Sequence, residues 1–221
     1  MATIMMSKKL KPFMQNSFYQ TFDFLGEELK ASNSAEKYDL SRLTTFDLEG
    51  KNILDVGCNA GYFMFKLLGK NPNWIMGIDS HRPFIDIARR INEECFQSNR
   101  LDFHVADFFK YKFPLDRMFD LIYCFSTFHY FYENQQLFFD KSYELLNKDG
   151  ILLVEIEENP DQGEAKIFSP PRPADGKCYF YPNPAMVKQW TKGIFKIVDK
   201  YVSTKQNGAV YERQFYVFQK L

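Results

Sequence analysis

The sequence has no paired cysteines, no excess of charge of one sign and no long apolar run, and each absence excludes a class of protein. Its four cysteines, Cys58, Cys95, Cys124 and Cys178, lie far apart and form no C-x-x-C pair. Neither a zinc site nor a disulfide framework is therefore indicated, and we expect no metal ion. Lys and Arg together number 28, as do Asp and Glu. The chain thus has no bulk positive charge with which to hold nucleic acid nonspecifically, although a local basic patch is not excluded.

Segments that would cross a membrane or direct secretion are also missing. No apolar run approaches the roughly 20 residues needed to span a bilayer. Residues 1–12 mix apolar side chains with basic ones and lack the apolar core of a secretory signal. We therefore expect a cytoplasmic protein that makes no membrane contact. The composition, 45% hydrophobic and 18% aromatic, is sufficient for the core of a compact domain.

The most informative stretch is residues 53–63, which read I-L-D-V-G-C-N-A-G-Y-F. A short apolar run containing an acid, followed by two glycines and an apolar helical pattern, predicts a strand, a tight turn and a helix. The turn of such a βα unit can receive a nucleotide-like ligand. A dinucleotide-binding turn would read G-x-G-x-x-G, but Asn59 and Tyr62 stand where its second and third glycines would be. An NAD-dependent oxidoreductase is therefore disfavoured.

Two further strands are predicted to end in an acid. The first covers residues 74–78 and leads into Asp79 and Ser80. Asp79 follows Asp55 at close to the spacing of about 20 residues that is typical of a ribose-binding carboxylate. A carboxylate there can accept hydrogen bonds from both ribose hydroxyls. A helix over 83–97 and a strand over 101–106 follow, and the strand leads into Asp107 and Phe108.

The second half of the sequence predicts the rest of a sheet. A strand over 119–125, a helix over 133–146, a turn at 147–150, a strand over 151–156 and a helix over 184–192 follow in order. Two alternating runs, 195–203 and 210–219, are joined through Gln206-Asn207-Gly208. Asn-Gly between alternating runs indicates a β-hairpin. The long proline-containing connection over 157–184 is predicted to be a functional loop or lid.

Together these motifs resemble the class I S-adenosylmethionine (SAM)-dependent methyltransferases, whose first motif is close to D-x-G-x-G-x-G. Asp55 to Gly61 match that motif except at Asn59, and Asn is the non-glycine residue that best accepts a positive φ. The resemblance implies an α/β, Rossmann-like fold with a seven-stranded, mostly parallel sheet in the order 3-2-1-4-5-7-6. A C-terminal antiparallel hairpin and helices on both faces belong to that fold. Residues 48–221 would form the methyltransferase domain, and residues 1–47 would be an N-terminal extension contributing to a substrate cap.

The resemblance also implies a site with SAM as the cofactor. His129, one of three histidines, follows the fourth strand and is the catalytic candidate, although a histidine at this place in similar methyltransferases often supports the site without transferring a proton. Glu155 and Glu157 are expected to point to opposite faces of the fifth strand, where one of them lines the pocket or, as the equal alternative, forms a salt bridge. The substrate contacts are assigned to Tyr19, Phe128, Glu155 and Tyr181. The cofactor contacts are assigned to Asp55, Gly57, Asn59, Gly61, Asp79, Ser80, Asp107, Phe108 and Phe125.

The acceptor of the transferred group is less well defined than the cofactor. SAM already holds an activated methyl, so the protein's main tasks are alignment and exclusion of water. The neutral net charge favours a small-molecule acceptor with an oxygen or nitrogen nucleophile. An RNA or tRNA methyltransferase is the first alternative, because residues 58–63 and 19–22 are similar to RNA-terminal-phosphate methyltransferases and tRNA wobble-uridine-modifying enzymes. A SAM-binding partner subunit without chemistry of its own is the second.

Overall fold

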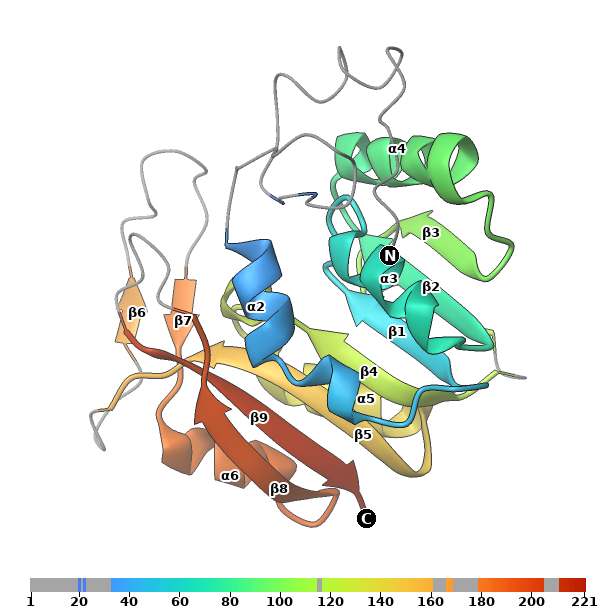
Figure 1. Cartoon of the computed structure of the whole chain (residues 1–221). Coiled ribbons are helices and arrows are strands. Elements are labelled where there is room, and N and C mark those ends of the chain that lie inside the picture. The colour runs from blue at the N-terminus through green and yellow to red at the C-terminus, as the bar shows by residue number, and fades with distance from the viewer. Residues whose placement is uncertain are drawn as a thin grey trace. The chain divides into compact units, whose positions relative to one another are not determined.

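A computed structural model describes Gln20, Phe22 and residues 33–114, 117–160, 166–168, 179–204 and 211–221. The chain divides into two compact units, Met1–Phe113 and Pro114–Leu221 (Figure 1). In the colours of Figure 1 the first unit runs from blue to green and the second from yellow-green to red. Within the described residues, no helix is both long and apolar enough to span a bilayer.

The first unit is built on three parallel strands whose apolar residues are buried. β1 pairs with β2 and β2 with β3, so that Leu54 lies opposite Met76 and Gly77 opposite Phe103. Buried, nearly continuous apolar strands are typical of parallel sheets covered on both faces. The elements of this unit are α2 (Ser34–Leu40), η1 (Leu43–Thr45), β1 (Asn52–Val56), α3 (Tyr62–Leu67), η2 (Leu68–Lys70), β2 (Trp74–Asp79), α4 (Arg82–Ile91), η3 (Asn92–Phe96) and β3 (Leu101–Val105).

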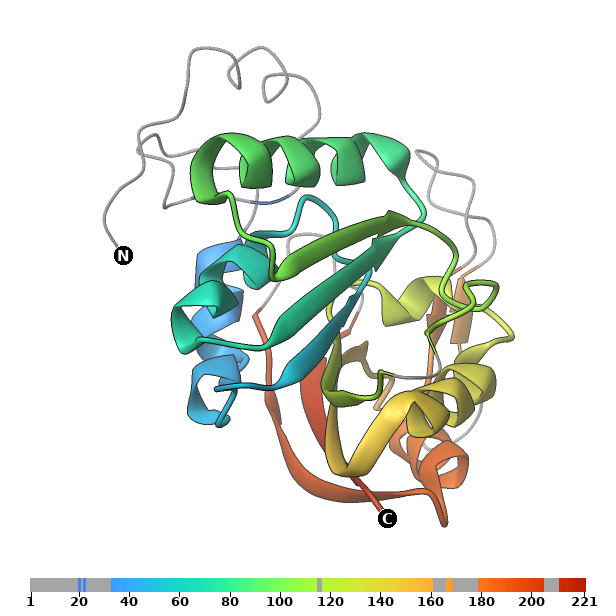
Figure 2. The same ribbon diagram turned by 90° about the vertical axis from the view of Figure 1, so that its right-hand side faces the viewer.

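α4 shows how sequence pattern sets an element in this unit. It has a proline in its first turn, where the missing N–H would have no helical partner. Its buried residues Ile85, Ala88 and Ile91 recur at helical spacing, and the helix packs on β2 and β3 (Figure 2). The sequence predicted a helix as far as residue 97. Instead the α-helix ends at Ile91 and continues as the single π-helical turn η3.

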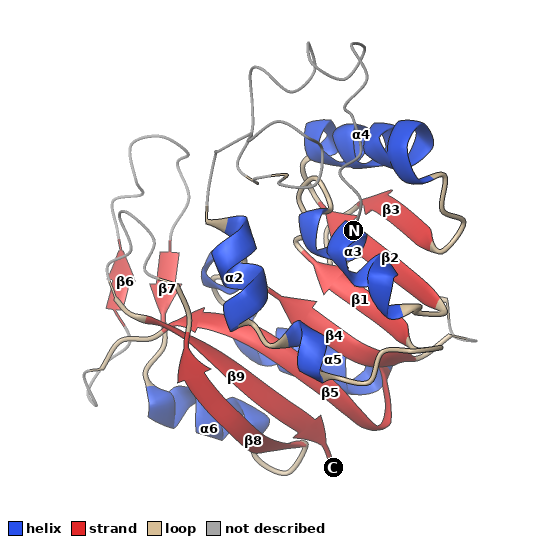
Figure 3. Ribbon diagram, in the orientation of Figure 1, coloured by secondary structure: helices blue, strands red, loops and turns tan. Residues whose placement is uncertain are grey.

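The second unit contains a parallel pair of strands followed by an antiparallel hairpin. β4 pairs parallel with β5, β5 pairs antiparallel with β9, and β8 pairs antiparallel with β9 (Figure 3). α6 begins with Pro184, and the Asn183 side chain accepts a hydrogen bond from the Met186 N–H at 2.9 Å. The elements are β4 (Phe119–Cys124), η4 (Phe128–Tyr130), α5 (Gln135–Leu145), β5 (Leu146–Glu157), β6 (Lys166–Phe168), β7 (Tyr179–Tyr181), α6 (Pro184–Thr191), β8 (Phe195–Val202) and β9 (Arg213–Lys220).

The order of the strands confirms the predicted fold class. Apart from the short β6–β7 pair, the strands follow the order β3-β2-β1-β4-β5-β9-β8. Numbered along the chain, this is the predicted 3-2-1-4-5-7-6 order of a mostly parallel, Rossmann-like sheet with a C-terminal antiparallel hairpin. The turn of that hairpin, including Asn207 and Gly208, lies outside the described residues. The predicted domain boundary between residues 47 and 48 stays a prediction.

Two connections differ from the prediction. The turn expected at 147–150 is part of β5, where Asp149 has a positive φ of 60° and the register against β4 shifts between Phe119 and Leu121. The predicted irregular connection over 157–184 contains the antiparallel pair β6–β7. Three-residue strands are too short to show an alternating pattern in the sequence. The rest of that connection, 161–165 and 169–178, lies outside the described residues.

Comparing Gly61 with Gly193 separates the cost of crowding at Gly61, in the turn before α3, from the cost of backbone strain. Both have a φ of +82°, but a Cβ on Gly61 would lie 2.8 Å from Phe103 Cε1, whereas a Cβ on Gly193 would meet nothing within 4 Å. We expect Gly193→Ala to lower the free energy of unfolding by about 1–2 kcal/mol through backbone strain alone. Gly61→Ala should lose about 1–3 kcal/mol more, because the Phe103 ring must move. Denaturant unfolding measures both, and equal losses would show that the ring yields freely.

Candidate functional site

The turn between β1 and α3 has three residues in the left-handed region. Gly57, Asn59 and Gly61 have φ values of 79°, 53° and 82°, so Asn59 adopts the conformation expected of it. The Asn59 Oδ1 accepts a hydrogen bond from the Ala60 N–H at 2.7 Å, which stabilises the turn locally. The Gly57 and Cys58 N–H groups both donate to the Ile78 carbonyl, at 2.8 and 3.2 Å. The turn is therefore anchored to β2.

Asp79 joins this turn to the end of β2. Its Oδ2 accepts a hydrogen bond from the Asn59 N–H at 2.9 Å, and its Oδ1 accepts one from the His81 N–H at 2.8 Å. The structure thus brings together two motifs that the sequence offered separately. A carboxylate has about four lone-pair positions, so capacity to accept from a ligand is left over. Ser80 is exposed beside Asp79, and Asp55 is buried within β1.

The third predicted acid, Asp107, organises a local turn after β3. Its Oδ1 accepts a hydrogen bond from the Phe109 N–H at 2.8 Å, and its Oδ2 lies 3.8 Å from the exposed Lys110 Nζ. Phe108 is buried, and its ring lies 5.7 Å from that of Phe113, edge to face. Asp107 is thus an exposed side chain at the carboxyl end of a strand, on a turn that it stabilises itself.

Cys58 is a core residue of the turn. Its thiol is 1% exposed, and it packs over β2, where a Cβ on Gly77 would lie 2.8 Å from its Sγ. Burial, and then the charges of Asp55 and Asp79, raise the pKa of this thiol well above its ordinary value. Because the thiolate is the nucleophilic form, Cys58 is a poor nucleophile at neutral pH.

Gln20 belongs to this site, although the sequence indicated it only as part of residues 19–22 and assigned it no contact. Its Oε1 accepts a hydrogen bond from the Tyr62 N–H at 3.2 Å, and its Nε2 donates one to the Cys58 carbonyl at 3.4 Å. The side chain is 6% exposed. Its neighbour Tyr19, a predicted substrate contact, lies outside the described residues. No local pattern could have found Gln20, because its partners lie about 40 positions away in the sequence.

In the second unit, the end of β5 carries a buried ionic cluster. Arg213 donates from Nε to the Glu157 Oε2 at 3.2 Å, and its Nη1 lies 3.7 Å from the Glu155 Oε2. The exposed fraction of the side chain is 1% for Glu155, 2% for Glu157 and 7% for Arg213. The expectation that the two glutamates point to opposite faces was wrong. Residues two apart in a strand point to the same face, so both carboxylates reach one guanidinium.

This cluster holds Ser126, the second residue after β4, in an uncommon backbone conformation. Ser126 has a φ of 53°, which non-glycine residues rarely adopt. The Glu155 Oε2 accepts from its N–H at 2.8 Å and from its Oγ–H at 3.1 Å, and Arg213 Nη1 donates to its Oγ at 3.1 Å. The other Glu155 oxygen accepts from the Ser203 hydroxyl at 2.5 Å. Glu155 thus shapes the chain after β4, whereas the prediction assigned it to substrate.

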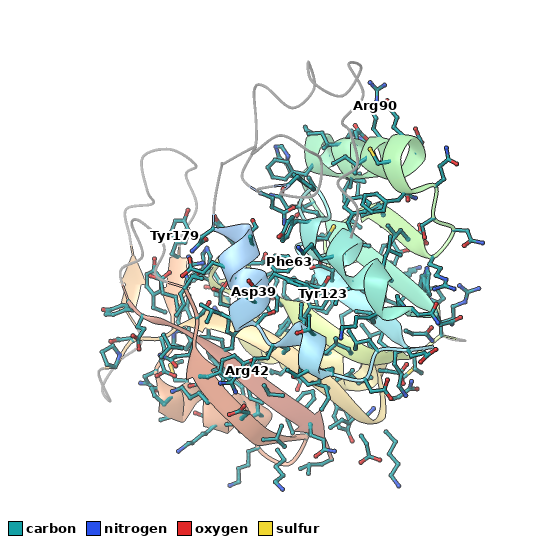
Figure 4. All side chains as sticks on the ribbon, in the orientation of Figure 1. Asp39, Arg42, Phe63, Arg90, Tyr123 and Tyr179 are labelled. Atoms are coloured by element: carbon teal, nitrogen blue, oxygen red, sulfur yellow. The ribbon has the colours of Figure 1, made fainter. Side chains whose placement is uncertain are left out.

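His129 lies in η4, next to an exposed aromatic residue. Its ring, 8% exposed, is stacked on that of Tyr179 at 5.3 Å and lies 4.2 Å from that of Tyr130. Tyr130 is 40% exposed, and Tyr179, labelled in Figure 4, comes from β7. Surrounded in this way by rings, His129 is placed to support the Tyr130 ring.

Three other predicted contacts in this unit are core residues. Phe128 is 1% exposed and its ring contacts those of Phe138 and Phe139. Phe125 is 5% exposed, and Tyr181 is 1% exposed. Their rings pack against those of Phe215 and Tyr211, respectively. These contacts favour packing over ligand binding for all three residues.

Comparison with known proteins finds a family model that matches part of the chain, and several relatives. A family model described as "Methyltransferase domain" matches residues 54–152, from β1 into β5. The chain is 27% identical over 188 residues to a tRNA U34 carboxymethyltransferase of Sulfurovum sp. (strain NBC37-1), covering 82% of this chain and 58% of that protein. A protein of the same name from Nautilia profundicola is 31% identical over 124 residues, 56% of this chain and 39% of that protein. The chain spans about three fifths of the length of the first curated relatives it matches.

Solved structures share the fold at low identity. The putative S-adenosylmethionine dependent methyltransferase from Listeria monocytogenes matches with a TM-score of 0.71 and 13% identity, covering 85% of this chain and 99% of that one. The N-methyltransferase NodS from Bradyrhizobium japonicum WM9, in complex with S-adenosyl-L-homocysteine, matches with a TM-score of 0.65 and 15% identity. That match covers 96% of this chain and 97% of the other.

The ionic cluster predicts a large effect of removing the Arg213 guanidinium, which contacts both buried carboxylates. Arg213→Met should lower the free energy of unfolding by about 3–5 kcal/mol, because it leaves two carboxylates buried without their guanidinium. Lys196→Met, at an exposed position of β8, is the control and should change it by less than about 0.5 kcal/mol. Adding Glu157→Gln to Arg213→Met should recover part of the loss. Denaturant titration of the four proteins measures this, and a loss below 1 kcal/mol for Arg213→Met would contradict it.

Proposed function

We propose that this chain, which contains a methyltransferase domain of the class I SAM-dependent superfamily, is an enzyme that binds SAM and transfers a group from it to RNA. The observation that carries the cofactor part is the junction at Asp79, which holds the turn after β1 through the Asn59 N–H. A carboxylate and a left-handed, glycine-containing turn meet there at the carboxyl ends of adjacent parallel strands. Open α/β sheets bind their ligands at such ends.

The residues of the first unit fit a nucleoside-bearing cofactor. We assign the ribose hydroxyls to Asp79, whose carboxylate retains lone pairs beyond the two that accept backbone N–H groups. Gly57 presents no side chain, so the backbone there can approach the ligand closely, and Gly61 is assigned to the same turn, where its missing Cβ makes room for Phe103. Asp107 and Phe108 are assigned to the adenine. When bound, SAM supplies a carbon that its sulfonium already activates. The protein therefore has to align the reactants and exclude water from the site.

The assignments in the remaining positions are also proposals. Asp55 and Ser80 flank the turn and the Asp79 carboxylate, and Phe125 follows β4. For His129 we propose a supporting role at the reacting end, because its ring is stacked on Tyr179 and carries the exposed Tyr130. A stacked, largely buried imidazole of this kind orients a neighbour.

RNA is the proposed acceptor because the curated relatives are named for a modification of tRNA at U34. The small-molecule acceptor favoured by the neutral net charge is not supported by these relatives. Net charge describes the whole chain, whereas RNA contacts depend on local charge.

Cofactor binding is tested at Asp79. We expect wild-type protein to bind SAM in calorimetry, and Asp79→Ala to bind it about 10- to 150-fold more weakly, the loss of a charge-assisted hydrogen bond worth about 1.5–3 kcal/mol. Asp86→Ala, an exposed acid of α4 near Arg89, is the control and should leave the affinity unchanged. Tight binding of NAD together with no binding of SAM would refute the assignment.

The acceptor is tested by following labelled SAM into RNA and metabolite pools. We expect the label to enter material that ribonuclease degrades, with tRNA as the main acceptor. The mass of the released nucleoside distinguishes a methyl from a carboxymethyl group, which is the group in the relatives' name. Label that survives ribonuclease in a small molecule would restore the metabolite acceptor. SAM binding without any labelled product, and with a copurifying partner, would favour the non-catalytic subunit.

A further inference from the structure

The turn that precedes α3 leaves backbone groups that its own side chains do not satisfy. α3 begins at Tyr62, its N-cap is Gly61, and no side chain at that N-cap position accepts a hydrogen bond from the helix. The first N–H groups of any helix lack partners within the helix and require another acceptor. A glycine N-cap supplies no oxygen from a side chain. The Tyr62 N–H must therefore find its acceptor elsewhere in the chain.

Gln20 meets this need from a distant part of the sequence. Its carbonyl oxygen accepts from the Tyr62 N–H at 3.2 Å, while its amide nitrogen donates to the Cys58 carbonyl at 3.4 Å. The Gln20 side chain thus bridges Cys58, the second residue of the turn, and Tyr62, the first residue of α3. Both ends of the amide are used, so the two bonds together fix its orientation. The position is 6% exposed, and buried hydrogen bonds of this kind are lost only at a free-energy penalty.

Aromatic rings pack around Tyr62, whose N–H is bonded to Gln20. Phe22 is fully buried, and its ring lies edge to face against that of Tyr62 at 5.8 Å. Tyr38 of α2 contacts the rings of Tyr62 and Phe63 at 6.5 and 6.2 Å, and Phe63 is labelled in Figure 4. Burial raises the pKa of Tyr38 to about 12, so its phenol stays neutral in this cluster at physiological pH. These rings pack on Tyr62 and Phe63, whereas the hydrogen bonds to Cys58 and Tyr62 are made by Gln20 alone.

The turn is consequently held by two side chains. Asp79 accepts from the Asn59 N–H, and Gln20 bonds to Cys58 and Tyr62. We propose that Gln20 is a positioning residue for the cofactor turn: it sets the backbone between Cys58 and Tyr62 in the conformation that receives SAM. The proposal rests on the SAM site put forward above. It gives the N-terminal segment a role toward the cofactor, where the sequence indicated a role toward the substrate alone.

The test compares two substitutions in that segment. Gln20→Met keeps the volume of the side chain and removes both hydrogen bonds. Phe22→Leu weakens the packing on Tyr62 and leaves the amide bonds in place. For each protein we measure SAM affinity by calorimetry, the thermal midpoint without ligand, and hydrogen exchange of the peptide that contains Tyr62.

We expect Gln20→Met to bind SAM about 5- to 30-fold more weakly, as for the loss of one or two buried hydrogen bonds, and to exchange the Tyr62 amide faster. Phe22→Leu should lower the thermal midpoint at least as much as Gln20→Met does, and yet bind SAM with an affinity within about 2-fold of wild type. A Gln20→Met protein that binds SAM as tightly as wild type would overturn the proposal. It would also be overturned if, in both variants, the loss of SAM affinity were simply proportional to the fall in thermal midpoint. Failure of the wild-type protein itself to bind SAM would instead overturn the proposed function.

Discussion

The structure depends most on the need to hold a turn whose backbone the sheet cannot satisfy. Between β1 and α3 the chain passes through three left-handed residues, Gly57, Asn59 and Gly61. The N–H groups of this turn are therefore not paired in the regular hydrogen-bond ladder of the sheet. Buried backbone donors require partners. The Ile78 carbonyl, the Asp79 carboxylate and the Gln20 amide supply them. Because each comes from outside the turn, its shape is set by β2 and by the N-terminal segment.

The second unit solves the same problem with the same chemistry. Ser126 follows β4 in a left-handed conformation, and the Glu155 carboxylate of β5 accepts from its N–H. In the first unit the turn follows β1 and the acid lies on β2, the parallel neighbour of β1. Here the residue follows β4 and the acid lies on β5, the parallel neighbour of β4. In both, a carboxylate at the end of one strand holds the chain that leaves the adjacent strand.

Local features were predicted from the sequence, and long-range partnerships were not. The glycines, Asn59 and the acid at the end of β2 are visible as a spacing pattern, and the strand order follows from the resemblance they carry. Gln20 and Arg213 are not visible in this way, because they bond to Tyr62 and Ser126 across 42 and 87 positions of sequence. The error at Glu155 was of another kind. The strand period of two, applied correctly, already places it and Glu157 on one face.

The partial burial of Asp79 and the full burial of Glu155 bear on what the protein does with its substrate. A charge removed from water is costly unless it is paired or hydrogen-bonded, and a left-handed serine adds strain of its own. A fold retains such features where the geometry they impose is useful, and both occur where strands end at their carboxyl edge. A transferase whose cofactor brings the reactive carbon gains rate from alignment more than from a proton-transferring group. Turns held rigid before any ligand arrives leave less ordering to be done on binding, and the carboxylates of Asp79 and Glu155, which accept from backbone N–H groups, achieve this.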